Sequence, residues 1–568
     1  MESHRPSKRV ANAVMAAAAE EEKEDRLSAL PDDLLHAILR SVPLKHAVRT
    51  AALSRRWAPL WLDALASSPV LDLGDRAFAR AQPPAQAAAA VRRCLRLHAE
   101  RGAPLDAFRL AFRSPAGGFA PDVVAWVAAA LARGAAEVAL HLTPTRWRRA
   151  VDDRWAADDL DDGVDATAFL ELPAALFEPT TSLTHLALVR CSLRAVPPSA
   201  PGLAGLRSLS LSHADVTDWH LRDILATLHS LEILTLRSCN LLSYVKVAGA
   251  KLRRLELVGC LAVREVWVGD APALESFVFH GDISYFSSGD SVLAYFRSAT
   301  PALRDSYLSH LCFGYAADGD DFYDLHCFAY YHLLNCVARS TTLTICSAGL
   351  QHIDAARAAA RTMDETELRC QLHSLTDQQF DVITRASALT MDMPNLQELQ
   401  LLMPSLGDDD VDRVAGFFEL TKPPILDRLF IRVVHHRKFV KLATDSKRSR
   451  GSSSSTVPDD EDDAEIAASN SDLVLDHLKF IKVLNFRGTR SEVRLLRFLM
   501  DRAPALEHLV LVTVEEEQGT LRDDEQMKII QRRLSAMRMS ESAVARVTVC
   551  RPSEDGSRNP ARTRFYHE

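Results

Sequence analysis

The sequence lacks most of the features that mark a secreted, membrane or metal-binding protein. Its ten cysteines are scattered along 568 residues without a CxxC pair, which argues for free thiols in a reducing compartment. It has no Asn-x-Ser/Thr acceptor for glycosylation. No apolar run reaches membrane-spanning length, and the N-terminus lacks the apolar region of a secretory signal. We therefore expect a nuclear or cytoplasmic protein that binds no membrane.

Catalytic and ligand-binding motifs are also missing. There is no nucleophile motif, phosphate-binding loop or H-E-x-x-H, and no Asp or Glu pair lies in a recognisable catalytic frame. A calcium loop at Asp158–Phe169 is excluded, because Leu160 and Phe169 occupy positions that require oxygen ligands. The net charge of −8 does not indicate the basic surface that nucleic-acid binding requires. The sequence predicts no catalytic residue, cofactor, metal or nucleic-acid partner.

A short stretch near the N-terminus contains more apolar residues than it can bury. Pro31 suits the first position of a helix, and the apolar residues Leu34, Leu35, Ile38 and Leu39 then recur at helical spacing. About forty residues cannot enclose a sizeable core alone. The excess must therefore pack against a partner or against the rest of the chain, and a plain helical cap on a repeat domain is the simpler alternative.

The same stretch continues with two further short helices. Pro43 ends the first helix, Leu44 and Val48 mark the second, and Ser54 is a candidate N-cap for a third helix carrying Trp57. The order LPDDLL, LSRRW and LW resembles an F-box, the helical module that docks proteins onto the Skp-family adaptor of a ubiquitin ligase. The resemblance implies adaptor binding through Leu30, Pro31, Leu34, Leu35, Ile38, Leu44, Val48, Leu53 and Trp57.

Beyond this module, one leucine-rich phrase recurs every 21–25 residues. Its form, L-x-x-L-x-L-x-x-C, and its period match a leucine-rich repeat. The central L-x-L predicts a strand whose leucines face the core, while WHLRDILATL (Trp219–Leu228) predicts a returning helix. The regular copies begin at Leu183, Leu206, Leu231, Leu252 and Leu274.

Further strands are predicted on both sides of the regular block. Residues 283–395 lose the phrase and hold either degenerate repeats or an inserted helical lobe. Cys191, Cys239 and Cys260 share one repeat position, where a small buried group that bonds to the turn backbone fits better than a metal ligand. The added strands are Val70–Leu73, Phe108–Phe112, Val138–Leu142, Thr341–Ile345 and those that begin near Leu396, Leu426 and Leu506.

The whole layout resembles plant F-box proteins with leucine-rich repeats and a C-terminal FBD-like region. LKFIKVLNFRGTRSEVRLLRFLMDRAPALEHLVL (Leu478–Leu511) predicts a strand, a turn near Gly488, a helix Glu492–Asp501 and a closing strand. The implied fold is α/β: a helical F-box and then a horseshoe with a parallel sheet on its concave side. The predicted segments are 1–24 (disordered), 25–65 (F-box), 66–441 (repeats), 442–470 (disordered acidic and Ser-rich linker), 471–550 (FBD-like) and 551–568 (tail).

The resemblance implies a non-catalytic substrate receptor of an SCF-type ubiquitin ligase. The F-box would bind the Skp-family adaptor and, through it, cullin and RING subunits, while the repeats would hold an unknown target protein. We expect the target to contact strand residues that point away from the leucine core, including Thr235, Arg237, Glu256, Gln400 and Val510. Two alternatives remain open: a binding or inhibitor scaffold outside any ligase, and an enzyme hidden in residues 283–395.

Overall fold

The computed structural model places the chain in two compact units, Met1–Leu203 and Ala204–Glu568. The boundary between the two units falls inside residues 66–441, which were predicted as one repeat domain. The segments predicted to be disordered, 1–24 and 442–470, lie outside the described residues. The structure describes residues 30–42, 44–75, 82–113, 118–143, 169–179, 182–197, 199–281, 294–296, 300–310, 327–371, 389–403, 406–433, 473–514, 528, 530–532 and 546–566.

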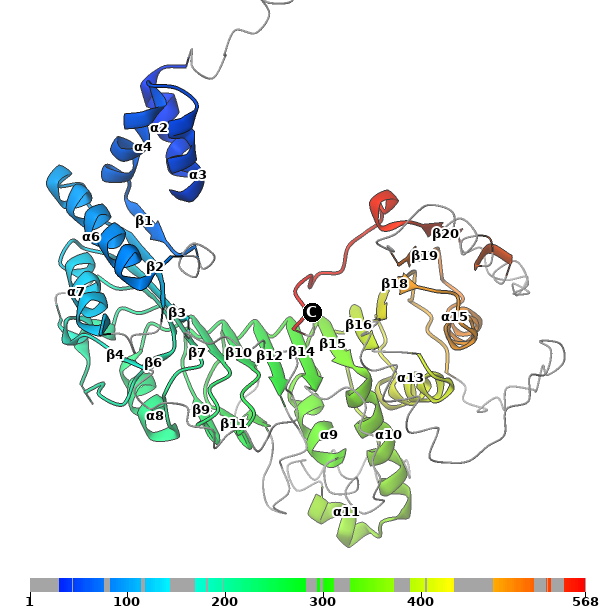
Figure 1. Cartoon of the computed structure of the whole chain (residues 1–568). Coiled ribbons are helices and arrows are strands. Elements are labelled where there is room, and N and C mark those ends of the chain that lie inside the picture. Colours follow the sequence, from blue (N-terminus) through cyan, green and yellow to red (C-terminus); the bar gives the residue numbers. More distant parts are fainter. Residues whose placement is uncertain are drawn as a thin grey trace, which may run out of the picture. The chain divides into compact units, whose positions relative to one another are not determined.

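The first unit begins with the predicted helical module (Figure 1). Pro31 precedes α2, and its carbonyl accepts hydrogen bonds from the amides of Leu34 and Leu35. Asp32 and Asp33 place negative charge at the positive end of this helix. The Ser54 hydroxyl accepts a 3.4 Å hydrogen bond from the Trp57 amide, where α4 begins. The elements are α2 (Asp32–Ser41), α3 (Leu44–Arg49), a 3₁₀ turn (Thr50–Ala52) and α4 (Trp57–Ala66).

A parallel sheet in order β1-β2-β3-β5 completes the first unit. The three strands predicted between the helical module and the regular repeats are confirmed as β1, β2 and β3. Helices α6 and α7 alternate with them, as parallel pairing requires a crossover between strands. The bounds are β1 (Val70–Leu73), α6 (Pro84–Arg101), β2 (Ala107–Arg113), α7 (Ala120–Leu131), β3 (Glu137–Thr143), β4 (Leu170–Glu171), β5 (His185–Val189) and β6 (Cys191–Ser192).

The second unit is built on a parallel sheet whose strands follow one another in chain order from β7 to β20, with β9, β11 and β13 forming a second small sheet. The regular and later strand predictions are confirmed, and the predicted helix Trp219–Leu228 is α8 (Asp218–Thr227). The sheet strands are β7 (Ser208–Ser212), β8 (Ile233–Arg237), β10 (Arg254–Val258), β12 (Ser276–Gly281), β14 (Asp305–His310), β15 (Thr342–Cys346), β16 (Glu398–Met403), β17 (Arg428–Val433), β18 (Phe480–Phe486), β19 (His508–Thr513) and β20 (Arg546–Cys550).

The regular repeats of this unit end their strands with the same tight turn. His213, Ser238 and Gly259 each follow a strand directly and have positive φ. The amides of these residues donate to carbonyls at the end of the next strand, to Arg237 at 2.8 Å, Val258 at 2.8 Å and His280 at 2.6 Å. The left-handed residue thereby ties each strand end to its neighbour, which fixes the register along the sheet.

The repeat cysteines are structural, as predicted. Cys239 is buried, and its thiol donates to the Leu211 carbonyl at 3.7 Å, while the Cys260 thiol donates to the Leu236 carbonyl at 3.6 Å. Burial raises the pKa of Cys191 to about 12, which keeps this thiol protonated. Among the described residues no group of three or more His, Cys, Asp or Glu side chains could hold a metal ion.

We expect the cysteines to be free in solution. None of the eight cysteines whose side chains the structure describes forms a disulfide. Titration of the denatured chain with a thiol reagent, in the absence of reductant, should therefore modify nearly all ten cysteines. Several stable disulfides in protein purified from a reducing cytosol would contradict this expectation.

The irregular segment 283–395 continues the sheet in its described part. Strands β14 and β15 extend the parallel sheet, and three helices connect its strands. The described part of the segment therefore combines the two predicted alternatives, degenerate repeats and inserted helices. Long helical returns replace the short ones of the regular repeats, which explains why the leucine phrase is lost. The helices are α9 (Cys327–Cys336), α10 (Ser347–Thr362) and α11 (Glu365–Gln371), and the small sheet is β9 (Tyr244–Val247), β11 (Glu265–Val268) and β13 (Ala294–Phe296).

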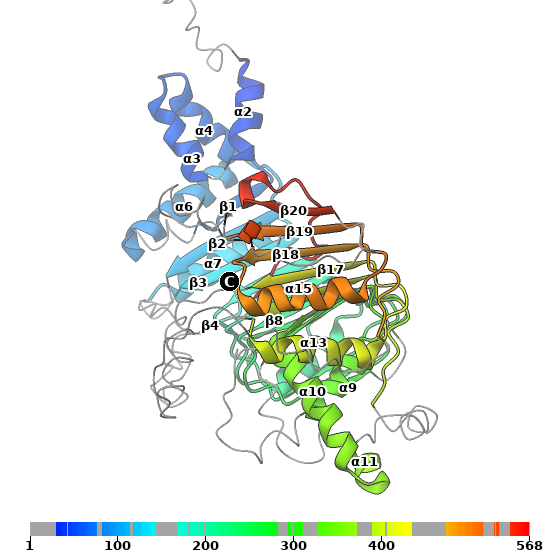
Figure 2. The ribbon, with the colours of Figure 1, turned by 90° about the vertical axis from the view of Figure 1, so that its right-hand side faces the viewer.

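The predicted strand, turn, helix and strand of the FBD-like region are confirmed as β18, Gly488, α15 (Arg490–Arg502) and β19. Gly488 has a φ of 71°, which favours glycine. Thr489 then caps α15: its hydroxyl accepts from the Glu492 amide at 3.3 Å, and the Glu492 carboxylate accepts from the Thr489 amide at 2.8 Å. Figure 2 shows α15 beside α13 (Asp408–Thr421) along strands β17–β19.

Removing this cap should weaken the FBD-like region measurably. Thr489→Ala deletes the hydroxyl that satisfies a helix-end amide, so we expect a loss of about 1 kcal/mol in the free energy of unfolding. Hydrogen exchange of α15 amides would report it. Arg490→Ala is the matched control, because Arg490 is the exposed first residue of the same helix. Equal protection in the two variants would show that the cap contributes nothing.

Candidate functional site

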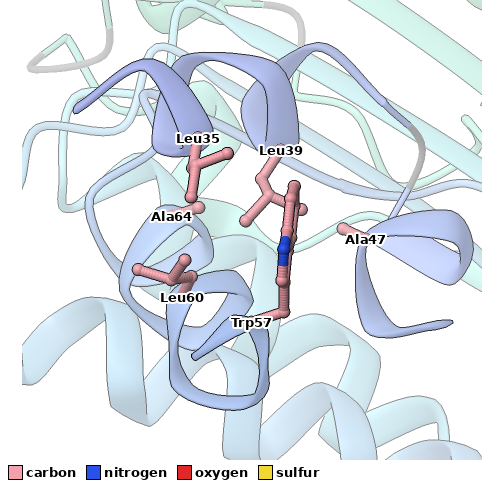
Figure 3. Close-up of a cluster of buried hydrophobic side chains, with 6 residues drawn as sticks. All are labelled: Leu35, Leu39, Ala47, Trp57, Leu60 and Ala64. Carbon is pink, nitrogen blue, oxygen red and sulfur yellow. The ribbon is translucent and has the colours of Figure 1, made fainter. Parts of the chain in front are cut away.

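The helical module has its own small core (Figure 3). Leu35 and Leu39 of α2 face Trp57 and Leu60 of α4, with Leu35 0% and Trp57 3% exposed. Leu35 and Trp57 therefore pack inside the module in this structure, and their contact with a partner stays a prediction. Helical spacing places Leu35 and Leu39 one turn apart on the face that α4 covers.

A second apolar face of the module remains exposed. Leu34 is 51% and Ile38 is 38% exposed, and they lie one turn apart on α2. Of the twelve large hydrophobic side chains exposed among the described residues, four lie between positions 34 and 53. That density in one short stretch is typical of a binding surface rather than of scattered surface residues. We call these four the exposed apolar set: Leu34, Ile38, Val48 and Leu53.

The remaining predicted adaptor contacts have mixed positions. Leu30 is partly buried against the module core, Pro31 is exposed, and the Leu44 side chain lies outside the described residues. Arg56 stabilises the start of α2 through two contacts. Its guanidinium lies 2.5 Å from the Asp32 carboxylate and donates a hydrogen bond to the Leu30 carbonyl at 2.7 Å. These contacts of Arg56 hold the residues at the start of α2 against the start of α4.

The predicted target-binding residues lie on one continuous face of the second unit. Register pairing aligns Thr235, Glu256, Val278, Tyr307, Thr344, Gln400, Phe430, Lys482 and Val510 across nine neighbouring strands. We call this the inner face. The residues on either side of each, most of them leucines, point to the opposite face, as strand alternation requires.

The inner face is not the open surface that the sequence led us to expect. Thr235 and Glu256 are each 8% exposed, Gln400 is 2% and Lys482 is 0% exposed. Residues 551–566 after β20 cover much of it (Figure 1). The burial of these residues leaves little open surface for a target in this structure, and their role in target binding stays a prediction.

The covering segment is attached first through a buried lysine. The Lys482 ammonium lies 2.6 Å from the Asp555 carboxylate and donates to the Arg558 carbonyl at 3.2 Å. Partial burial alone would raise the pKa of Asp555, but hydrogen bonds from Lys482 and Ser557 outweigh it and lower that pKa. Further along, the Ala561 amide donates to the Glu398 carboxylate at 2.7 Å.

An arginine makes the next attachment. Arg562 donates through both Nε and Nη2 to the Asp305 carboxylate, with Nε at 3.1 Å. The Ser276 hydroxyl donates to the same carboxylate at 2.8 Å and so fixes its orientation. The Arg562 guanidinium also lies 5.3 Å from the centre of the Tyr307 ring. Two parallel hydrogen bonds and a ring contact recognise a guanidinium specifically.

Two aromatic residues end the described chain. Phe565 lies under the Arg432 guanidinium, 4.4 Å from it, and joins a cluster with Val278 and Tyr307. The Tyr566 ring meets the Tyr307 ring edge to face at 5.3 Å. Its hydroxyl donates to the Glu256 carboxylate at 3.3 Å, and the same carboxylate is paired with Arg237 at 3.1 Å.

Sequence reasoning missed this covering segment. Residues 551–566 carry no repeat phrase and no apolar period, so nothing local predicts their docking. The one available signal was the composition of residues 562–566, where Arg562 and Arg564 precede the adjacent aromatic residues Phe565 and Tyr566. None of the described helices is both long and apolar enough to cross a membrane.

Family models match three parts of the chain. The model described as F-box domain matches residues 27–64, which contain α2 to α4. The model described as FBD-associated F-box protein At5g56370, LRR repeats, matches residues 160–301, and the FBD model matches residues 472–511. The resemblance seen in the sequence is confirmed: the chain carries an F-box, leucine-rich repeats and an FBD region.

Similar curated proteins named as F-box or F-box/FBD/LRR-repeat proteins come from Arabidopsis thaliana. The chain is 28% identical over 237 residues to F-box protein At5g03100, covering 41% of this chain and 64% of that protein. It is 31% identical over 201 residues to F-box/FBD/LRR-repeat protein At2g04230, covering 34% and 38%. It is 53% identical over 55 residues to F-box/FBD/LRR-repeat protein At5g22660, covering 10% and 11%. The chain thus spans less than two thirds of each relative's length.

Proposed function

We propose that this chain is the substrate-recognition subunit of an SCF-type ubiquitin ligase. The F-box would bind a Skp-family adaptor and, through it, cullin and RING subunits. The leucine-rich second unit would hold a target protein. We place this activity in the nucleus or cytoplasm, in line with the free thiols.

The exposed apolar set supports the adaptor half of the proposal. The module buries Leu35 and Trp57 in its own core, yet leaves Leu34 and Leu53 half or more exposed. A module that can fold while retaining exposed apolar side chains is suited to docking, because burying those side chains on a partner removes apolar surface from water. The F-box match over the same residues agrees with this reading.

The chain would act by proximity rather than by chemistry. Holding a target near a ubiquitin-charged enzyme raises the effective concentration of target lysines at the reactive thioester. The chain would contribute no catalytic group, and the F-box and leucine-rich-repeat families it matches are typically non-catalytic adaptors. Its task is therefore two simultaneous binding events.

The experiment is reconstitution with purified components. The full chain should capture a plant Skp-family adaptor and, with it, the cullin. Affinity purification from plant cells under proteasome block should then enrich the target. Failure to capture any Skp-family adaptor would favour the alternative, a leucine-rich scaffold that binds or inhibits proteins outside a ligase.

A further inference from the structure

The segment that covers the inner face crosses it in one direction. Its contacts run from Lys482 on β18 through Glu398 on β16 and Asp305 on β14 to Glu256 on β10. The segment thus travels back across the sheet as its residue numbers rise from 555 to 566.

An extended conformation accounts for this reach. From β18 to β10 there are six strand steps of about 4.8 Å, or about 29 Å in all. Eleven residue steps span at most about 36–40 Å when extended, whereas a helix of that length covers only about 17 Å. The inner face therefore accommodates an extended peptide lying across its strands.

Recognition of this peptide comes mainly from side chains. The hydrogen bonds described above place Arg562 on the Asp305 carboxylate and the Tyr566 hydroxyl on Glu256. Both receiving carboxylates are also held by groups of the second unit itself, Asp305 by Ser276 and Glu256 by Arg237. The site is thus preorganised for an arginine followed four residues later by an aromatic residue.

The covering segment is itself only loosely enclosed. No residue of 551–566 is fully buried, and ten of these sixteen residues are exposed. The surface beneath it, by contrast, includes fully buried Tyr307 and Lys482. Because the segment is largely exposed while the surface beneath it is buried, it resembles a bound ligand more than a strand of the core.

We propose that the inner face from β8 to β16 is a binding site for extended peptides in which an arginine precedes an aromatic residue by four positions. Residues 559–566, NPARTRFY, occupy the site in cis and must leave before a target segment of the same chemistry can bind. The cellular role of the site rests on the proposed function, whereas peptide binding itself does not depend on it.

The test uses full-length protein and a fluorescent peptide of residues 559–566. The release variant combines Arg562→Ala with Tyr566→Ala, which removes the two side chains that reach Asp305 and Glu256. Fluorescence anisotropy should show at least tenfold tighter peptide binding to the release variant than to the wild type. In the wild type the tethered segment competes at high effective concentration.

Three controls make the comparison specific. Arg558→Ala removes an equal charge from the same segment, but the Arg558 side chain is exposed and its contact to Lys482 uses the backbone carbonyl, so this variant should bind as weakly as the wild type. A peptide with Arg562→Lys should bind about tenfold more weakly, because lysine cannot make the paired hydrogen bonds. Asp305→Asn in the release variant should reduce binding similarly.

Clear results would overturn the proposal. Absence of peptide binding by a folded release variant would do so, as would binding that occurs only in a dimer exchanging its tails. Adaptor capture by the same variant is measured in parallel, so that loss of peptide binding with capture retained refutes this inference and not the proposed function.

A second measurement applies if the release variant does not fold. Hydrogen exchange on the wild type follows the amides of Ala561 and Tyr566, which donate to Glu398 and to the Tyr307 hydroxyl. We expect these amides to exchange at least a hundredfold faster than those of β14 and β16, and faster still with excess peptide. Exchange as slow as that of the strands would show a permanent part of the fold and refute the proposal.

Discussion

Replacing Leu34 and Ile38 together by alanine is expected to abolish capture of a Skp-family adaptor. Both side chains are exposed and lie on one face of α2, so their loss removes contact area without opening the module core. Apolar hot spots at interfaces are each worth roughly 2–4 kcal/mol on truncation. The double variant should therefore bind the adaptor at least a hundredfold more weakly, as measured by surface plasmon resonance with immobilised adaptor.

A matched pair outside the module makes this result interpretable. Leu241→Ala with Tyr244→Ala removes two apolar side chains that are 49% and 51% exposed in the second unit. This control should bind the adaptor as the wild type does. Equal adaptor affinity of the folded Leu34 and Ile38 variant and the wild type would rule out the exposed apolar set as the docking surface.

The second large effect is expected at the buried ion pair. The Lys482 side chain is 0% exposed, and Asp555→Ala would leave its ammonium group without a carboxylate partner. An uncompensated buried charge costs about 3–5 kcal/mol. The segment should respond by undocking, which returns Lys482 to water, and amides near Ala561 should exchange about a hundredfold faster.

Removing the lysine should cancel this effect. In a Lys482→Met background no charge remains to be left unpaired, so Asp555→Ala should change the exchange of the segment little. Glu554→Gln is the neighbouring control, because Glu554 is exposed and its carboxylate accepts from the Arg551 amide instead. Additive effects of the Lys482 and Asp555 substitutions would show that the pair does not hold the segment.

The sequence was a reliable guide wherever structure is local. Each L-x-L phrase became a strand, because leucines two apart share the face that must be buried. The turn at Gly488 and the helix after it were also predicted, and in the structure Thr489 and Glu492 cap that helix. Only in residues 283–395 did the long helical returns obscure the period.

The two faces of α2 could not be told apart from its sequence. All four apolar residues of α2 are similarly hydrophobic. Helical spacing alone allows either Leu34 and Ile38 or Leu35 and Leu39 to face the core. The position of α4 decides the matter by covering Leu35 and Leu39. The sequence alone therefore could not show that Leu35 and Trp57 lie in the core of the module, whereas Leu34 and Ile38 remain exposed.

The covered inner face depends on contacts between residues far apart in sequence. Tyr566 meets Glu256 across 310 positions, and Arg562 meets Asp305 across 257. No local pattern encodes such a contact, since it requires the whole sheet to form first. The sequence therefore predicted which strand residues share a face but not that the chain covers them itself.

The most direct test of the account is a hydrogen-exchange footprint of a Skp-family adaptor on the full-length chain. We predict protection of α2, α3 and α4, with the exchange of strands β8 to β18 unchanged. Absence of binding, or protection confined to the inner face of the second unit, would contradict the assignment of the exposed apolar set to the adaptor.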